Sequence, residues 1–485
     1  MKTLFKHLLI AFSSVALVSC SYDGLDSGLY SYWDGSGEES NEKYKDYAEN
    51  QFITTADQPV STFSVDADGG AYANMRRFMT SGDTVPRAAV RIEEFINYFT
   101  FDYAEPEAGE NVAINSEIAT CPWNAEHHLI RVGMKGKTIP ASEMTSSNYV
   151  FLIDVSGSMS SPDKLDVLKA GFKLMTDQLS ANDKVAIVTY AGSAAVLLNS
   201  TSGDQKAKIK KAIDKLGAGG STAGAEGIVT AYKIAQENFI QNGDNRIIIG
   251  SDGDFNVGPS TPDELIKLIE EKRESGVYIT VLGVGTGNLN DHMMEQIANN
   301  GNGNYEYIDC ADELIKVFIN EKTKFHTVAK DSKIQITFNP DKVHSYRLIG
   351  YENRALKQED FENDSTDAGE IGSSQTITAL YEVVLTTNLS AGPYAFFDFR
   401  YKKPGESESR LINHTINSIP VAMQSASENM RFASSLTAFG LILKHSAYKG
   451  TAKKQMVLDL GNSAKTFDPN GYRSKFIDIV RAWKE

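Results

Sequence analysis

Five oxygen-bearing side chains between residues 154 and 252 have the types and the spacing of ligands for one divalent cation. They stand in three short segments, D-V-S-G-S, G-G-S-T-A-G and S-D-G-D, and are Asp154, Ser156, Ser158, Thr222 and Asp252. Oxygen ligands without nitrogen or thiolate suit a hard cation, Mg²⁺ first and Mn²⁺ or Ca²⁺ as alternatives. Because only two of the five ligands carry a charge, the metal would keep positive character and a free position. We therefore expect it to accept an acidic side chain, Asp or Glu, of a protein partner.

The chain around these residues has the pattern of an α/β domain that would bring them together. Asp154 and Asp252 each follow an apolar run typical of a buried strand, and Thr222 lies in a glycine-rich loop ahead of a helical segment. We expect strands at 149–155, 185–190, 195–198, 247–251, 278–283 and 305–308, and helices at 164–179, 205–216, 224–239, 262–275, 291–299 and 311–320. This alternation predicts a doubly wound, mostly parallel sheet, whose ligands bind beyond the carboxyl ends of the strands. The three loops should converge there, with Asp254 beside the site as a modulator at most.

The five positions, in this order, resemble the metal-ion-dependent adhesion site (MIDAS) of von Willebrand factor type A (VWA) domains, and residues 147–322 resemble such a domain throughout. F-S-V-D-A-D-G-G-A-Y-A-N-M-R-R-F and V-R-I-E-E-F-I-N-Y-F before the domain, and L-I-G-Y-E-N-R and D-A-G-E-I-G after it, resemble the flanking modules of bacterial YfbK-like VWA proteins. The resemblance implies a Rossmann-like fold and metal-dependent protein binding, with Thr222 a direct or water-mediated ligand. It also implies that ligand at the metal is coupled to movement of the last helix of the domain, 311–320. It does not identify the partner.

Strand patterns on both sides of the VWA segment predict that the VWA domain is inserted into a β-sandwich. They lie at 112–120 and 128–134 before it, and at 333–338, 345–351, 376–386, 394–401 and 410–416 after it. Helical patterns occur at 71–81, at 92–99 with Pro86 ahead of it, and near the end at 427–444, 453–460 and 472–483. The expected organisation is a signal peptide (1–20), an acidic disordered tether (21–57), a helical module (58–110), the first sandwich strands (111–146), the VWA domain (147–323), the remaining sandwich strands (324–420) and a helical C-terminal segment (421–485).

The first residues have the pattern of a bacterial export signal. Lys2 and Lys6 precede an apolar segment, which ends in L-V-S-C at Cys20 and resembles a lipobox. The mature protein would then begin at a lipid-modified Cys20 and be anchored to the membrane in the cell envelope, at the outer membrane or at the periplasmic or cell-surface face. A plain secretory signal with an incidental cysteine is the alternative.

The net charge limits the kinds of partner that are expected, and the cysteines limit the disulfides that can form. The formal charge of −15 argues against nucleic acid as a partner, because the phosphates would be repelled. Beyond Cys20, the chain holds Cys121 and Cys310, which are either two buried thiols or one disulfide in an oxidising compartment.

Two other functions compete with metal-dependent binding. A hydrolase of the phosphotransferase type also places an Asp after the first strand of such a sheet, but it needs a second acid two residues later, where this chain has Ser156. No nucleophile elbow is present either, so we expect no enzymatic activity. A purely structural scaffold of the envelope is the other alternative. It would mean that a complete set of metal ligands is present but binds no metal.

Two acidic clusters have plainer interpretations than cation binding. Asp66 and Asp68 precede the helix at 71–81 without the rest of an EF-hand pattern, which favours helix capping. Five acids follow one another between residues 360 and 370 without the glycine of a calcium loop, which favours a solvated surface loop; they are Asp360, Glu362, Asp364, Asp367 and Glu370.

Overall fold

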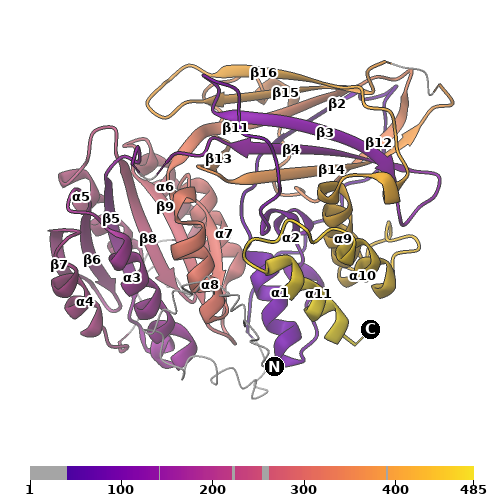
Figure 1. The fold of residues 1–485 in the computed structure, drawn as a ribbon. Coiled ribbons are helices and arrows are strands. Elements are labelled where there is room, and N and C mark those ends of the chain that lie inside the picture. Colours follow the sequence, from indigo (N-terminus) through magenta and orange to yellow (C-terminus); the bar gives the residue numbers. More distant parts are fainter. Residues whose placement is uncertain (1–40, 141, 221–223, 254–260, 389–391, 485) are drawn as a thin grey trace, which may run out of the picture.

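The computed structural model describes residues 41–140, 142–220, 224–253, 261–388 and 392–484. Figure 1 shows three neighbouring parts: a helix-covered sheet, a sandwich of two sheets beside it, and a group of helices beneath the sandwich. The described chain contains no helix of the length and apolarity needed to cross a membrane.

The first part is a six-stranded sheet with the order β10-β9-β8-β5-β6-β7, parallel except for the pairing of β7 with β6. Its strands are β5 (Ser147–Asp154), β6 (Lys184–Tyr190), β7 (Ala194–Ser202), β8 (Asp244–Ser251), β9 (Tyr278–Val284) and β10 (Tyr305–Ile308). Its helices are α3 (Val167–Gln178), α4 (Lys206–Asp214), α5 (Gly224–Glu237), α6 (Pro262–Arg273), α7 (Asp291–Asn300) and α8 (Ala311–Ile315).

Helices cover both faces of this sheet because its central strand is apolar on both sides. Every residue of β5 is buried. Phe151 packs with α3, α4 and α8, where its ring lies 4.3 Å from that of Phe172, whereas Val150 and Leu152 pack with α5, α6 and α7. The predicted doubly wound fold is confirmed.

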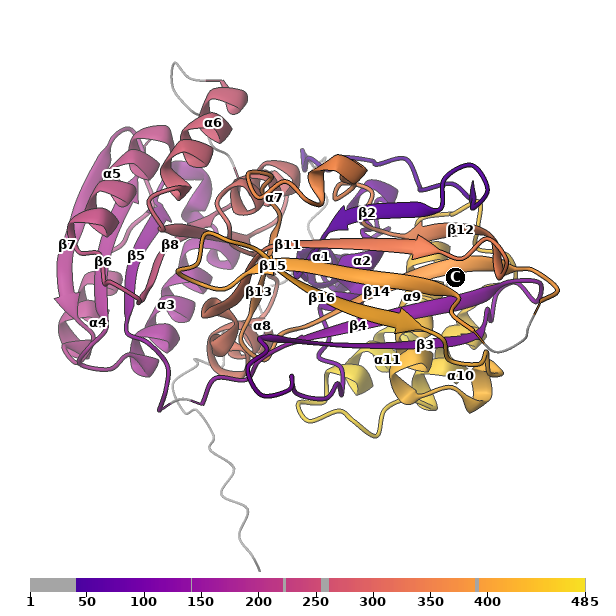
Figure 2. The same cartoon turned by 90° about the horizontal axis from the view of Figure 1, so that it is seen from above.

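The second part is the β-sandwich, and strands from both ends of the chain build it. One sheet has the order β1-β12-β14-β4-β3; the other has the order β13-β11-β15-β16, and β2 also pairs with β11. The bounds are β1 (Ile53–Thr54), β2 (Val60–Ser64), β3 (Val112–Thr120), β4 (His128–Gly136), β11 (Thr327–Phe338), β12 (Val343–Ile349), β13 (Gly369–Gly372), β14 (Thr376–Leu385), β15 (Ala395–Lys402) and β16 (Arg410–Ile416). Because β4, before the VWA segment, pairs with β14, after it, the VWA fold is an insertion, as predicted. Figure 2 shows the two sheets stacked.

The third part is a helical group from both ends of the chain. It contains α1 (Gly70–Ser81), α2 (Ile92–Asn97), α9 (Glu428–Leu443), α10 (Lys454–Asn462) and α11 (Tyr472–Ala482). An aromatic core joins them: the ring of Phe432 on α9 lies 5.0 Å from that of Phe99 and 5.9 Å from that of Phe476 on α11.

The export signal with Cys20, and the expected tether up to residue 40, lie outside the described residues. The rest of the expected tether, residues 41–57, lies against the body instead of being disordered: Asn41 N donates to Gly287 O (2.8 Å), and Glu42 pairs with Arg77 (2.8 Å). The expected helical module also differs from the structure. The segment 58–110 is not wholly helical, because it opens with β2, a strand of the sandwich. These polar segments are held by distant partners, which local patterns do not reveal.

Three smaller expectations are also resolved. Cys121 and Cys310 are both free thiols, so the disulfide that was one of the two alternatives does not form. The helix expected at 311–320 is α8 followed by a π-helical segment, Lys316–Asn320. Helix capping by Asp66 and Asp68 is wrong: α1 begins after Gly69 and has no side-chain cap.

Candidate metal centre

Two neighbouring parallel strands carry the two carboxylates of the candidate site. Ile153 of β5 lies opposite Gly250 of β8, so Asp154 and Asp252 emerge at the same edge of the sheet. Both are fully buried. Since β5 has β8 on one side and β6 on the other, this edge is the point where the strand order reverses, which is where such sheets bind ligands.

The loop after β5 folds its two serines beside Asp154. Ser156 N donates to Asp154 Oδ1 (2.9 Å), and the Oγ atoms of Ser156 and Ser158 are 3.0 Å apart. This turn presents two hydroxyl oxygens and a carboxylate within one short segment.

The glycine-rich loop runs alongside this turn. Gly219 N donates to Val155 O (2.7 Å), and Gly157 N donates to Gly220 O (3.0 Å). Gly220 has a positive φ of 96°, a backbone conformation that favours glycine. Thr222 and Asp254 lie outside the described residues, so the structure brings together Asp154, Ser156, Ser158 and Asp252 of the predicted set.

Ser251, which the sequence analysis did not single out, orients the first carboxylate. Its hydroxyl donates to Asp154 Oδ2 (3.1 Å) and accepts a hydrogen bond from Gly253 N (2.9 Å). It is the last residue of β8 and directly precedes Asp252, so its position at the end of a strand was the available signal.

Lys164 is a second residue that the sequence analysis missed. Its Nζ lies 3.0 Å from Asp252 Oδ2 and 2.6 Å from Asn288 Oδ1, and Asn288 Nδ2 donates to the same Asp252 oxygen (3.0 Å). Lys164 is only 5% exposed. No local pattern signals this pairing, because the three residues are far apart in the chain.

The two carboxylates differ in their electrostatics. Burial raises the pKa of Asp154 to about 6, and the charge of Asp252 adds to the effect. Burial also acts to raise the pKa of Asp252, but the Lys164 cation and the hydrogen bonds from Asn288, Lys164 and Ser158 outweigh it and hold that pKa below its usual value. Asp252 therefore stays ionised at lower pH than Asp154, which holds a proton below about pH 6 and must lose it there before it can bind a cation.

The donor set fits a hard divalent cation. Two carboxylates and two hydroxyls supply oxygen only, in an edge built from separate loops. Elsewhere in the described part of the chain, no group of three or more His, Cys, Asp or Glu side chains is arranged to hold a metal ion.

Matches to family models agree with this architecture. Family models match "von Willebrand factor type A domain" over residues 148–319, "Uncharacterized protein YfbK, C-terminal" over 323–485 and "von Willebrand factor" over 38–131. Among solved structures, a von Willebrand factor type A protein from Catenulispora acidiphila is 16% identical and has a TM-score of 0.48, covering 78% of this chain and 91% of its own.

Curated relatives give the family. A UPF0353 protein of Mycobacterium sp. (strain KMS) is 28% identical over 235 residues, which are 42% of this chain and 69% of that protein. The uncharacterized protein YfbK of Escherichia coli (strain K12) is 40% identical over 464 residues, which cover 90% of this chain and 80% of the relative. The chain therefore belongs to the YfbK family of proteins with a von Willebrand factor type A domain.

Proposed function

We propose that this protein binds a protein partner in the bacterial cell envelope through a divalent metal, Mg²⁺ in the first place, held at a MIDAS. The ligands would be Asp154, Ser156, Ser158, Thr222 and Asp252. The observation that carries the proposal is the meeting of two buried carboxylates and two adjacent hydroxyls at the ends of neighbouring parallel strands. No catalytic activity is part of the proposal.

The proposed ligands include both charged and neutral side chains. Asp154 and Asp252 would hold the cation electrostatically, and the serine hydroxyls would ligate it without adding charge. Such a metal supplies a strong point of attraction for an acidic side chain of the partner. Lys164, paired with Asp252, reduces the negative charge of the site further and favours an anionic ligand.

A pull-down from envelope extracts tests this function. The chain from residue 21, without the lipidated cysteine, is used as bait with Mg²⁺, with EDTA, and as Asp154→Ala. We expect partners that are retained in Mg²⁺ and lost in both other samples. Asp166→Ala, an exposed acid close in sequence, is the matched control and should behave like the wild type. Partners that bind equally in EDTA and in Asp154→Ala would contradict the proposal, and metal-dependent hydrolysis of phosphoesters or peptides would favour a hydrolase.

The anchor is a separate part of the proposal. Lys2, Lys6 and the L-V-S-C segment support lipid modification of Cys20. We expect Cys20→Ser to move the protein from the membrane fraction to the soluble fraction, whereas Cys121→Ser should leave it with the membranes. Unchanged membrane association of Cys20→Ser would reject the lipid anchor and leave the metal site untouched.

A further inference from the structure

A polar cavity of about 260 Å³ lies between the VWA domain and the sandwich, beside the connection that leads into α1. Its walls come from the β2–α1 connection, from α7 with the turn after it, and from the segments after β12 and before β13. The proposed metal ligands do not line it, so its function is independent of theirs.

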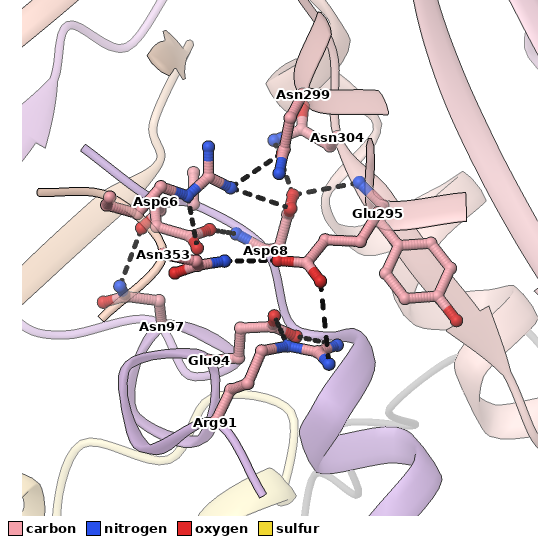
Figure 3. A network of polar contacts seen from close by, with 12 residues as sticks. Asp66, Asp68, Arg91, Glu94, Asn97, Glu295, Asn299, Asn304 and Asn353 are labelled. Carbon is pink, nitrogen blue, oxygen red and sulfur yellow. Dashed lines mark hydrogen bonds and ion pairs between the residues drawn. The ribbon is translucent and has the colours of Figure 1, made fainter. Parts of the chain in front are cut away.

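Hydrogen bonds between the lining segments fix the walls of the cavity, as Figure 3 shows. Arg354 donates from Nε to Asp66 Oδ2 (3.0 Å) and from Nη2 to Asn299 Oδ1 (2.7 Å). Asp68 Oδ1 accepts from Tyr305 N (2.9 Å), and Asn353 donates to Glu295. The walls of the cavity are therefore held in place by specific contacts. Asp66 and Asp68, which were expected to cap a helix, take part in these contacts instead.

The cavity wall has unused acceptors. Among the described lining residues, the buried side-chain atoms without a hydrogen bond are all oxygens: Asp68 Oδ2, Glu295 Oε2, Asn302 Oδ1, Asn353 Oδ1 and both carboxylate oxygens of Glu370. Asp68 Oδ2 still lies 3.5 Å from Arg354, and Glu295 Oε2 lies 3.8 Å from Arg91. Buried acceptors of this kind call for a ligand that brings donors.

Glu370 is the lining acid whose carboxyl group has the fewest polar partners. It is buried on β13, and within the described chain neither of its oxygens has a hydrogen bond or an ion pair. The interpretation of residues 360–370 as a solvated loop is therefore wrong for Glu370, which lies inside. Burial, together with the like charges of Asp331 and Asp367, raises the pKa of this carboxyl, and the charges of Lys330 and Arg246 offset this only in part.

The charge of the lining specifies the class of ligand. Its ionisable acids are Asp66, Asp68, Glu295, Asp367 and Glu370. Arg354 pairs with Asp66 and Asp68, Arg91 lies 3.8 Å from Glu295, and Arg273 pairs with Asp367 (2.6 Å). Glu370 is therefore the lining acid that has no ion pair within the described chain. Because these acids do not form a cluster arranged to chelate a bare metal ion, the complement is a cation that carries its own N–H donors. We propose that this cavity binds a small organic cation with primary ammonium groups.

Calorimetric titration of the full mature chain with 1,4-diaminobutane tests the proposal, together with thermal unfolding at several ligand concentrations. We expect saturable binding and an unfolding temperature that rises with ligand. The neutral analogue 1,4-butanediol, and NaCl at equal ionic strength, should not reproduce the effect. The proposal is overturned if the diamine gives no saturable heat, or if NaCl gives the same shift.

Two variants locate the ligand. Glu370→Gln removes the carboxyl group that would pair with the ammonium, at nearly constant volume, and should weaken diamine binding about tenfold or more. Asn302→Gly removes one acceptor at a position with a φ of 54°, which glycine adopts freely, and should also weaken it. Glu362→Gln, on the exposed loop before β13, is the control and should bind like the wild type. Undiminished binding in both cavity variants would overturn the assignment.

Discussion

At the scale of single residues, the proposed metal site depends on how much negative charge it keeps. Asp252 is shared between the site and Lys164, whose ammonium lies 3.0 Å from it in a buried environment. A cation already in place competes electrostatically with a metal, but it also leaves a bound metal more attractive to an anion. Lys164 would therefore tune metal and partner affinity in opposite directions.

Lys164→Met should separate these two effects. We expect the dissociation constant for Mg²⁺ to fall about tenfold, because the local positive charge is gone. Binding of an acidic partner to the loaded protein should weaken at the same time. Calorimetry with Mg²⁺ and with the captured partner measures both, and Lys169→Met on α3 is the control. Metal and partner affinity that fall together would indicate only a structural role for Lys164.

The raised pKa of Asp154 gives the metal-free protein a characteristic pH dependence. Since the folded-state pKa of about 6 exceeds the usual value for an aspartate, the folded protein holds its proton more tightly than the unfolded chain. Stability contributed by this group is therefore present at low pH and falls as the pH rises toward 6, by an amount on the order of 1–3 kcal/mol.

Urea unfolding in EDTA between pH 4 and pH 7 measures this change. Asp154→Asn, which cannot ionise, should lose less stability over the same range than the wild type. Added Mg²⁺ should stabilise the wild type above pH 6 and leave the variant unchanged. Parallel pH profiles for the two proteins would show that Asp154 does not titrate as described.

At the scale of elements, the last helix of the VWA domain is held by the helical group, through residues from before and after the domain. Arg76 of α1 pairs with Asp309 and Glu313 at the start of α8, and Tyr98 Oη donates to Glu313 (2.7 Å). Asn320, at the end of the π-helical segment, donates to Tyr472 Oη of α11 (2.9 Å). A shift of this helix would therefore change its contacts with α1 and α11, which lie outside the VWA domain.

Arg76→Met removes the central cation of this contact. It would leave two buried carboxylates unpaired, so we expect a loss of about 3 kcal/mol in the free energy of unfolding. Arg87→Met, which breaks a largely exposed pair with Asp46, should cost less than about 1 kcal/mol. Equal effects of the two substitutions in urea unfolding would contradict a structural role for the Arg76 contact.

The elements predictable from the sequence are those with strong local patterns. The apolar runs of β5 and β8 predict buried parallel strands, and the position of Asp154 and Asp252 after them predicts their convergence. By contrast, β2 is a short mixed segment whose partner, β11, lies far along the chain. Lys164, Asn288 and Glu370 were not recognisable as site residues, because their surroundings are set by contacts between distant segments.

At the scale of the whole molecule, the insertion makes the two ends of the chain interdependent. The helical group joins Phe99, before the VWA domain, to Phe432 and Phe476, which come after the whole sandwich. The sandwich likewise pairs β4 with β14 across the insertion. We expect the flanking parts to unfold as one unit.

Phe476→Ala tests this interdependence. Phe476 is fully buried among aromatic rings from both ends of the chain, so its truncation should cost about 3–5 kcal/mol in the free energy of unfolding. Hydrogen exchange should speed up in α1 and α2 as well as in α9 and α11. Phe239→Ala, at a residue 39% exposed, serves as the control and should have a small effect. Faster exchange confined to α11 would contradict the expected cooperativity.

The most direct test of the central claim is anomalous diffraction from crystals of the protein grown with Mn²⁺. We predict one anomalous peak at the edge of the sheet, within ligand distance of the Ser156 and Ser158 hydroxyls and of Thr222, with Asp154 and Asp252 holding it directly or through water. Crystals of Asp154→Ala should lack the peak. Well-ordered wild-type crystals without a peak at this edge would contradict the account.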